Sequence, residues 1–203
     1  MSDHHPTSKT GTTEMVHADR KEGLLKTTSV LAYLLFLVLN LHTVGIFQQP
    51  QIYEEIQQTY FTPDNWVFLV WPIIHVLLLC PILYSHTSGR GNAVVINRIS
   101  WEFPLFMVLY AFFVTLRTNN HPVAAFGLSF CLVYVAFSIN FLSLLEEYSP
   151  ESVGEQLFIV FPFSVCQAWN TFIFCLSAFE AFGVDAIKQD AGTWTGFWVV
   201  VAL

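Results

Sequence analysis

The chain has 203 residues, of which 54 % are hydrophobic and only 11 % charged, against about 25 % charged residues in an ordinary soluble domain. A soluble fold of this size could not cover its surface with so few charges. This apolar content excludes a disordered chain and a small disulfide scaffold. The net charge of −7 excludes a nucleic-acid-binding protein, which needs a basic surface. The composition therefore indicates a polytopic membrane protein.

Five stretches are long and apolar enough to cross the hydrocarbon core, which takes roughly 17–25 residues in a helix. They lie at 29–47, 66–84, 99–116, 123–145 and 157–179, and a further apolar run begins near Trp194 and reaches Leu203. Helices are predicted because lipid cannot satisfy open backbone groups. We therefore predict an all-α, polytopic transmembrane helix bundle with five complete spans plus the start of a sixth. Nothing in 194–203 ends a helix, so we expect the apolar run to continue beyond Leu203.

The first 28 residues are polar and precede a predicted membrane domain at 29–203. No apolar run comes before Ser29, so this tail lacks the features of a signal peptide. Residues 1 to about 22 are predicted to be disordered. Lys and Arg number six on the side of the tail and two on the other, counted over the tail and the short loops. The excess of positive charge predicts a cytoplasmic N-terminus.

The start of the second span carries the most informative residues, in the stretch YFTPDNWVFLVWP at 60–72. Thr62 can cap a helix whose first turn holds Pro63 and Asp64, because proline lacks the unpaired N–H and a carboxylate suits the positive helix end. Trp66 suits the headgroup level of a membrane. Pro72 is expected to kink the helix one and a half turns further on.

This stretch resembles the tryptophan-rich sensory proteins, the TspO/translocator-protein relatives, and in particular their six-span branch. The second-span pattern of that branch is matched by Thr62, Pro63, Trp66, Phe68, Trp71 and Ile74. A second match in the fifth span comprises Pro162, Phe163, Ser164 and Trp169. The sequence departs from the branch at Pro72 and His75, where a Gly and a Tyr are usual, and in the third span, which lacks the usual Asn and paired Trp. The resemblance implies a helical bundle that binds tetrapyrroles or sterol-like molecules.

Ionisable and amide side chains at membrane depth are costly, and each is a candidate for a functional role. The predicted ligand-binding residues are Trp66, Phe68, Trp71 and His75 of the second span, facing Trp169 and Asn170 of the fifth. His75 lies four residues after Trp71 and so on the same helix face. It is expected to be a polar group in an aromatic pocket, with a packing role or haem ligation as alternatives. The segment 48–65 has amphipathic spacing, which predicts a surface helix or, from the resemblance, a lid over the pocket.

Other polar groups favour structural roles. Interhelical hydrogen bonds are predicted for Asn40, Asn140 and Asn170. Arg98 and Glu102, four residues apart, predict an ion pair at a helix start, with a proton relay at Glu102 as the alternative. Arg117 is expected to reach the headgroups by snorkelling. The four cysteines lie inside spans without metal-ligand spacing, which predicts packed thiols and no metal site.

The sequence carries no G-x-S-x-G, no H-E-x-x-H and no Gly-rich phosphate loop, so we expect a protein that is not an enzyme. The first hypothesis is an integral membrane protein that binds an amphipathic small molecule between its helices. The residues identify no cofactor, and a tetrapyrrole is the one that the resemblance implies. The alternative is a transporter of a small solute, because Pro72, Pro162 and the buried amides could support gating. The expected partners are membrane lipid and the ligand; a homo-oligomer is left open.

Overall fold

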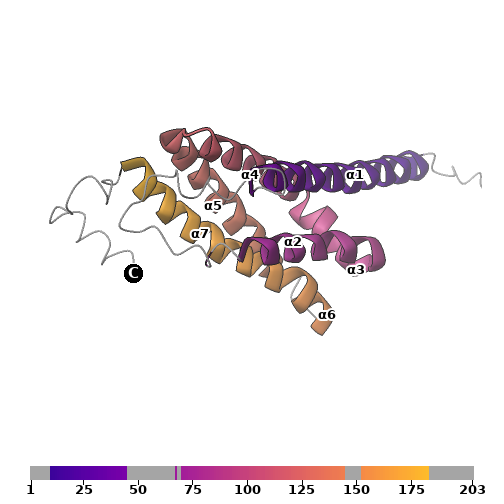
Figure 1. Ribbon diagram of the computed structural model, residues 1–203. Coiled ribbons are helices and arrows are strands. Elements are labelled where there is room, and N and C mark those ends of the chain that lie inside the picture. Colours follow the sequence, from indigo (N-terminus) through magenta and orange to yellow (C-terminus); the bar gives the residue numbers. More distant parts are fainter. Residues whose placement is uncertain (1–9, 45–66, 68–69, 145–151, 183–203) are drawn as a thin grey trace, which may run out of the picture.

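The computed structural model describes residues 10–44, 67, 70–144 and 152–182, and the regular elements in these ranges are helical. The long helices are α1 (Thr10–Val44), α2 (Val70–Thr87), α4 (Glu102–Thr118), α5 (Pro122–Leu144) and α7 (Phe161–Phe182). Two short segments, α3 (Gly89–Asn92) and the π-helical η3 (Ala93–Ile99), precede α4. A further pair, α6 (Val153–Glu155) and the π-helical η5 (Gln156–Val160), runs directly into α7. Figure 1 shows α6 and α7 following one line across the bundle.

Four helical stretches are long and apolar enough to cross a membrane, and a fifth span results if η3 and α4 are counted as one bent unit. The prediction of a multi-pass helical membrane protein is therefore confirmed in its coarse form. The sixth predicted span, from Trp194, lies outside the described residues. In the bundle, α5 packs along α7 and α1 along α4. Figure 1 shows α4 and α5 side by side, with α2 nearer to α7.

The prediction that residues up to about 22 are disordered is wrong for residues 10–22, because α1 begins at Thr10. Glu22 accepts hydrogen bonds at 2.8 Å from Lys26, one turn further along α1, and at 2.8 Å from the Asn92 side chain. Leu25 is fully buried. These contacts stabilise the helix in a stretch where the composition is polar.

The third predicted span, 99–116, begins later than expected because the chain turns sharply before it. The axes of η3 and α4 differ by 76°, and Ser100 between them has φ 51°, in the left-handed region that L-residues seldom adopt. The η3 segment contributes four buried apolar residues, Val94, Val95, Ile96 and Ile99. The membrane helix itself starts at Glu102.

The kink expected at Pro72 stays a prediction. Pro72 lies in the first turn of α2 as described, and residues 68 and 69, which come before that turn, lie outside the described residues. A proline further inside α2 is Pro81, which is buried.

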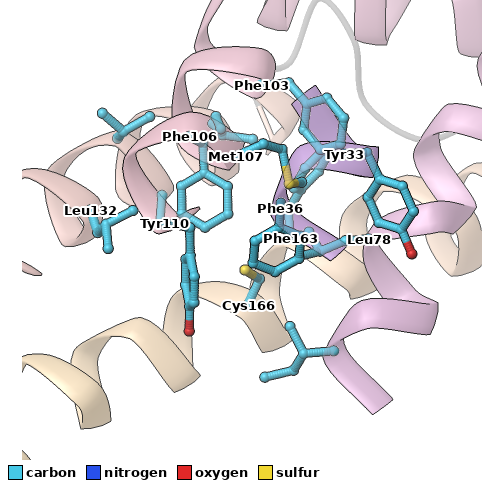
Figure 2. Packing of buried hydrophobic residues seen from close by; sticks show 14 of the residues in the cluster. Tyr33, Phe36, Leu78, Phe103, Phe106, Met107, Tyr110, Leu132, Phe163 and Cys166 are labelled. Atoms are coloured by element: carbon cyan, nitrogen blue, oxygen red, sulfur yellow. The ribbon is translucent and has the colours of Figure 1, made fainter. Parts of the chain in front are cut away.

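Aromatic side chains fill the centre of the bundle. Figure 2 shows Phe106 and Tyr110 from α4 on one side of this core and Tyr33 from α1 on the other, with Phe36 from α1 and Phe163 from α7 between them. Phe103 meets Phe163 with ring centroids 5.8 Å apart, and Phe106 meets Tyr110 at 5.6 Å, both in edge-to-face geometry. Such pairs add about 0.5–1.5 kcal/mol beyond area burial. The Phe103–Phe163 pair therefore ties α4 to α7.

Candidate functional site

The two tryptophans of the matched motifs meet inside the bundle. Trp71 lies in the first turn of α2 and Trp169 near the middle of α7, with ring centroids 6.5 Å apart and a T-shaped arrangement. His75 follows one turn after Trp71, and its ring lies 6.1 Å from the indole. The helical spacing of four residues thus places both side chains on one face of α2, from which Trp71 meets Trp169 of α7.

Two residues from α1 and α4 complete this group. Phe36 lies 4.6 Å from the His75 ring and 5.2 Å from Tyr110, and Tyr110 lies 5.6 Å from Trp71, all measured between ring centroids. We call Phe36, Trp71, His75, Tyr110 and Trp169 the tryptophan cluster. It joins α1, α2, α4 and α7 through ring contacts.

The tryptophan cluster and its flanks contain buried polar atoms without a hydrogen-bond partner among the described residues. They are the indole Nε1 of Trp71, the Nδ1 of His75, the indole Nε1 of Trp169 and the side-chain Oδ1 atoms of Asn40 and Asn170. The Trp169 N–H lies near the Tyr110 hydroxyl but does not make a hydrogen bond of ordinary geometry with it. Leaving such a group unpaired costs about 1–3 kcal/mol, so polar atoms of this kind point to a further partner.

The asparagine side chains make two kinds of hydrogen bond, within a helix and between helices. Asn40 donates to the carbonyl of Phe36 at 2.8 Å, and Asn170 donates to the carbonyl of Cys166 at 2.6 Å, each within its own helix. The prediction of interhelical bonds is therefore wrong for these two, since a side chain can bond to the preceding turn. Both residues are 1 % exposed, and their amide oxygens remain available.

Asn140 makes the predicted interhelical contact. Its Nδ2 donates to Oε1 of Gln167 at 2.7 Å, and its Oδ1 accepts from the hydroxyl of Ser164 at 3.0 Å. This network links α5 to α7. Because its polar groups pair with one another, we assign it a structural role.

Two charged residues are joined across the bundle. Arg117, at the end of α4, donates through Nε and Nη2 to the two carboxylate oxygens of Glu180, at the end of α7, at 3.1 and 2.5 Å. The prediction that Arg117 snorkels to the headgroups is therefore wrong. A planar guanidinium matches a carboxylate in this bidentate manner, and the partner is 63 residues away, so local sequence could not reveal it. Glu102 accepts a hydrogen bond from Ser138 of α5 at 3.1 Å.

Part of the predicted site cannot be placed. Trp66, Phe68 and the segment 48–65 lie outside the described residues. The structure brings Trp71, His75 and Trp169 together and places Asn170 beside Trp169, but Phe36 and Tyr110 were not among the predicted site residues. The signal for Phe36 was its position one turn before Asn40, and for Tyr110 it was a phenol in the middle of an apolar span.

The prediction of packed thiols is confirmed at Cys166 and is wrong at Cys131. Cys80, Cys131, Cys166 and Cys175 are free thiols, of which only Cys166 is buried and Cys131 is exposed. The described residues contain no group of three His, Cys, Asp or Glu side chains that could hold a metal ion.

Comparison with protein families gives one match over most of the chain. The family model described as "TSPO-like protein" matches residues 26–203. Neither curated proteins nor solved structures yield a match. The matched range includes both tryptophan motifs and all five residues of the tryptophan cluster.

Proposed function

The chain belongs to the TSPO-like protein family and is a multi-pass integral membrane protein, and on this premise we propose that it binds an amphipathic small molecule at the tryptophan cluster. The ligand class that the family resemblance supports is a tetrapyrrole or a sterol-like molecule. The observation that carries the proposal is the set of unpartnered polar atoms within an aromatic interior.

The composition of the cluster supports this assignment. Ligand sites are lined mainly by apolar and aromatic groups, with a few polar groups that fix orientation. Here the rings of Phe36, Trp71 and Trp169 provide the apolar lining, while His75 and the oxygen of Asn170 provide polar contacts. Trp71 and Trp169 are only 9 % and 7 % exposed, so they face the interior of the protein and not lipid.

Ligand titration of wild-type protein and of Trp71→Leu and Trp169→Leu in nanodiscs tests the proposal. The probes are protoporphyrin IX, followed by its absorbance, and radiolabelled cholesterol. The dissociation constant of a bound probe should rise in both variants by the equivalent of about 1–3 kcal/mol, the value of burying such a side chain.

The matched control is Trp101→Leu, because Trp101 is 51 % exposed and lies outside the cluster. Its affinity should equal that of the wild type. Folded Trp71→Leu and Trp169→Leu proteins with unchanged affinity would contradict the proposal. Flux of either probe across liposomes, dependent on the protein, would instead favour the transporter hypothesis.

The proposed orientation has the N-terminus in the cytoplasm, supported by the excess of Lys and Arg in the tail and in the segment that contains Arg90 and Arg98. A membrane-impermeant thiol reagent should label Glu55→Cys and Ser2→Cys from opposite sides of sealed vesicles. Labelling of both from one side would refute this orientation.

A further inference from the structure

The outward face of α5 carries a hydroxyl at a depth that water does not reach. Tyr134 is 70 % exposed on the surface of the bundle. It lies near the middle of α5 (Pro122–Leu144), about 15–18 Å from either end at 1.5 Å per residue. The hydrocarbon core of a membrane is about 30 Å thick, so Tyr134 lies near its centre. A tyrosine side chain is too short to bring its hydroxyl from there to the headgroups.

This hydroxyl lacks a partner within the chain. In the part of the chain that the structure describes, Tyr134 makes no hydrogen bond. Lipid tails offer neither donors nor acceptors, so a hydroxyl left unpaired at this depth is costly. The large exposed side chains of α1 and α2 are in contrast aliphatic, as at Leu34 and Val76. Tyr134 therefore points to a partner that reaches it inside the membrane.

A glycine on the same face of α5 allows this partner to come close. Gly127 precedes Tyr134 by seven residues, or two helical turns, so the two residues lie on one side of the helix. A Cβ added at Gly127 would meet no atom of the described residues within 4 Å. Glycine is unfavourable inside a helix, and packing among the described residues does not require it here. In membrane helices, small residues let the backbones of two helices approach each other.

A second copy of this chain fits both features. All copies cross the membrane in the same direction, so two α5 helices that face each other lie parallel about a twofold axis, and identical residues meet. A phenol is both donor and acceptor, so the Tyr134 hydroxyl of one copy can donate to that of the other. The spacing of seven residues keeps Gly127 and Tyr134 on one seam of a parallel helix pair. A second copy thus supplies both the space and the hydrogen-bonding group by symmetry.

We propose that the exposed face of α5 forms the interface of a homodimer, with the Gly127 residues of the two copies in close contact and a hydrogen bond between their Tyr134 hydroxyls. Cys131 lies between these residues along the helix and is an exposed free thiol. In the parallel pair, the two Cys131 thiols lie near the twofold axis. This interface does not include the tryptophan cluster, so the inference is independent of the proposed function.

Subunit counting by single-molecule photobleaching in liposomes, at decreasing protein density, tests the dimer. Wild-type protein should bleach in two steps at high density and dissociate on dilution. Tyr134→Phe removes only the hydroxyl and should raise the density at half-dissociation about threefold to tenfold, the effect of losing one interhelical hydrogen bond. Gly127→Leu should give monomers at every density. Gly89→Leu is the matched control, because a Cβ there also meets nothing within 4 Å, and it should behave as wild type.

Oxidation with copper phenanthroline locates the interface. A covalent dimer should form in wild-type protein and be lost in Cys131→Ser, since the other thiols are buried or only partly exposed. A dimer without this cross-link would place the two thiols away from the axis and overturn the proposed interface.

Two results of the counting experiment would also overturn the proposal. Wild-type monomers at every density would mean that lipid, another protein or residues 183–203 cover this face of α5. A dimer that both Gly127→Leu and Tyr134→Phe leave intact would place the interface elsewhere. Wild-type protein and Tyr134→Phe decide the question even if Gly127→Leu fails to fold.

Discussion

The Arg117–Glu180 pair yields a prediction about the contact between the ends of α4 and α7. The two side chains are 13 % and 7 % exposed and bond through two parallel contacts. Replacing Glu180 by Gln removes the negative charge and leaves the guanidinium without its counter-charge. Breaking a buried ion pair in this way typically destabilises a protein by about 3–5 kcal/mol. We expect Glu180→Gln to lower the unfolding free energy by that amount.

The assay is an SDS titration in mixed micelles, with unfolding followed by far-ultraviolet circular dichroism. Asp19→Asn is the matched control, because it makes the same chemical change at an exposed carboxylate and should alter the free energy by less than about 0.5 kcal/mol. The double variant Arg117→Met/Glu180→Leu removes both charges and should recover most of the loss, since an apolar pair of similar volume is often as stable.

The reasoning would be refuted if Glu180→Gln and Asp19→Asn had equal effects. The reasoning would also be refuted if the double variant lost more unfolding free energy than the single variants Arg117→Met and Glu180→Leu lose together. Either result would mean that solvent or headgroups, and not Glu180, compensate the Arg117 charge.

Three further predictions concern the stability of the bundle, and the same titration measures them. Gly91→Ala should lower the unfolding free energy by about 1–3 kcal/mol, because the added Cβ would lie 2.5 Å from Cδ1 of Tyr84. Gly89→Ala, with nothing within 4 Å of its Cβ, should be nearly neutral, and equal effects of the two changes would contradict this. Ser100→Gly should stabilise by about 1 kcal/mol, because glycine adopts a positive φ without strain, and a loss of stability would argue against the strained turn. Asn140→Leu should destabilise by about 0.6–1.7 kcal/mol through loss of its bonds to α7, and an unchanged midpoint would show that the network contributes nothing.

Hydropathy located the later helices better than the first, because lipid-exposed backbone leaves few alternatives to a helix. The first predicted span, 29–47, begins after the start of the candidate span Asp19–Leu41. The predicted span 123–145 corresponds to α5 at Pro122–Leu144, and 157–179 lies within the continuous helix 153–182. The break before α4 was missed because Ser100, which has a positive φ between η3 and α4, is neither glycine nor proline. The turn before α4 could therefore not be predicted from local sequence signals.

The candidate site was predictable where helical spacing and the family resemblance agreed. Trp71 and His75 share a face because they are four residues apart, and Trp71 meets Trp169 of the second matched motif. The contacts of Phe36 and Tyr110 could not be predicted, since they depend on how α1 and α4 pack around α2. The same limit applies to Arg117, whose partner lies on a helix distant in sequence.

Photoaffinity mapping of the bound molecule tests the central claim most directly. A photoreactive analogue of cholesterol is bound to the wild-type protein in nanodiscs, activated by light, and its attachment sites are identified by peptide mass spectrometry, with excess cholesterol as competitor. The account predicts competed labelling on α2 around Trp71 and His75 and on α7 around Trp169. Labelling confined to the exposed face of α5, at residues such as Phe130 and Phe137, would place the molecule among the surrounding lipids and contradict a site between the helices.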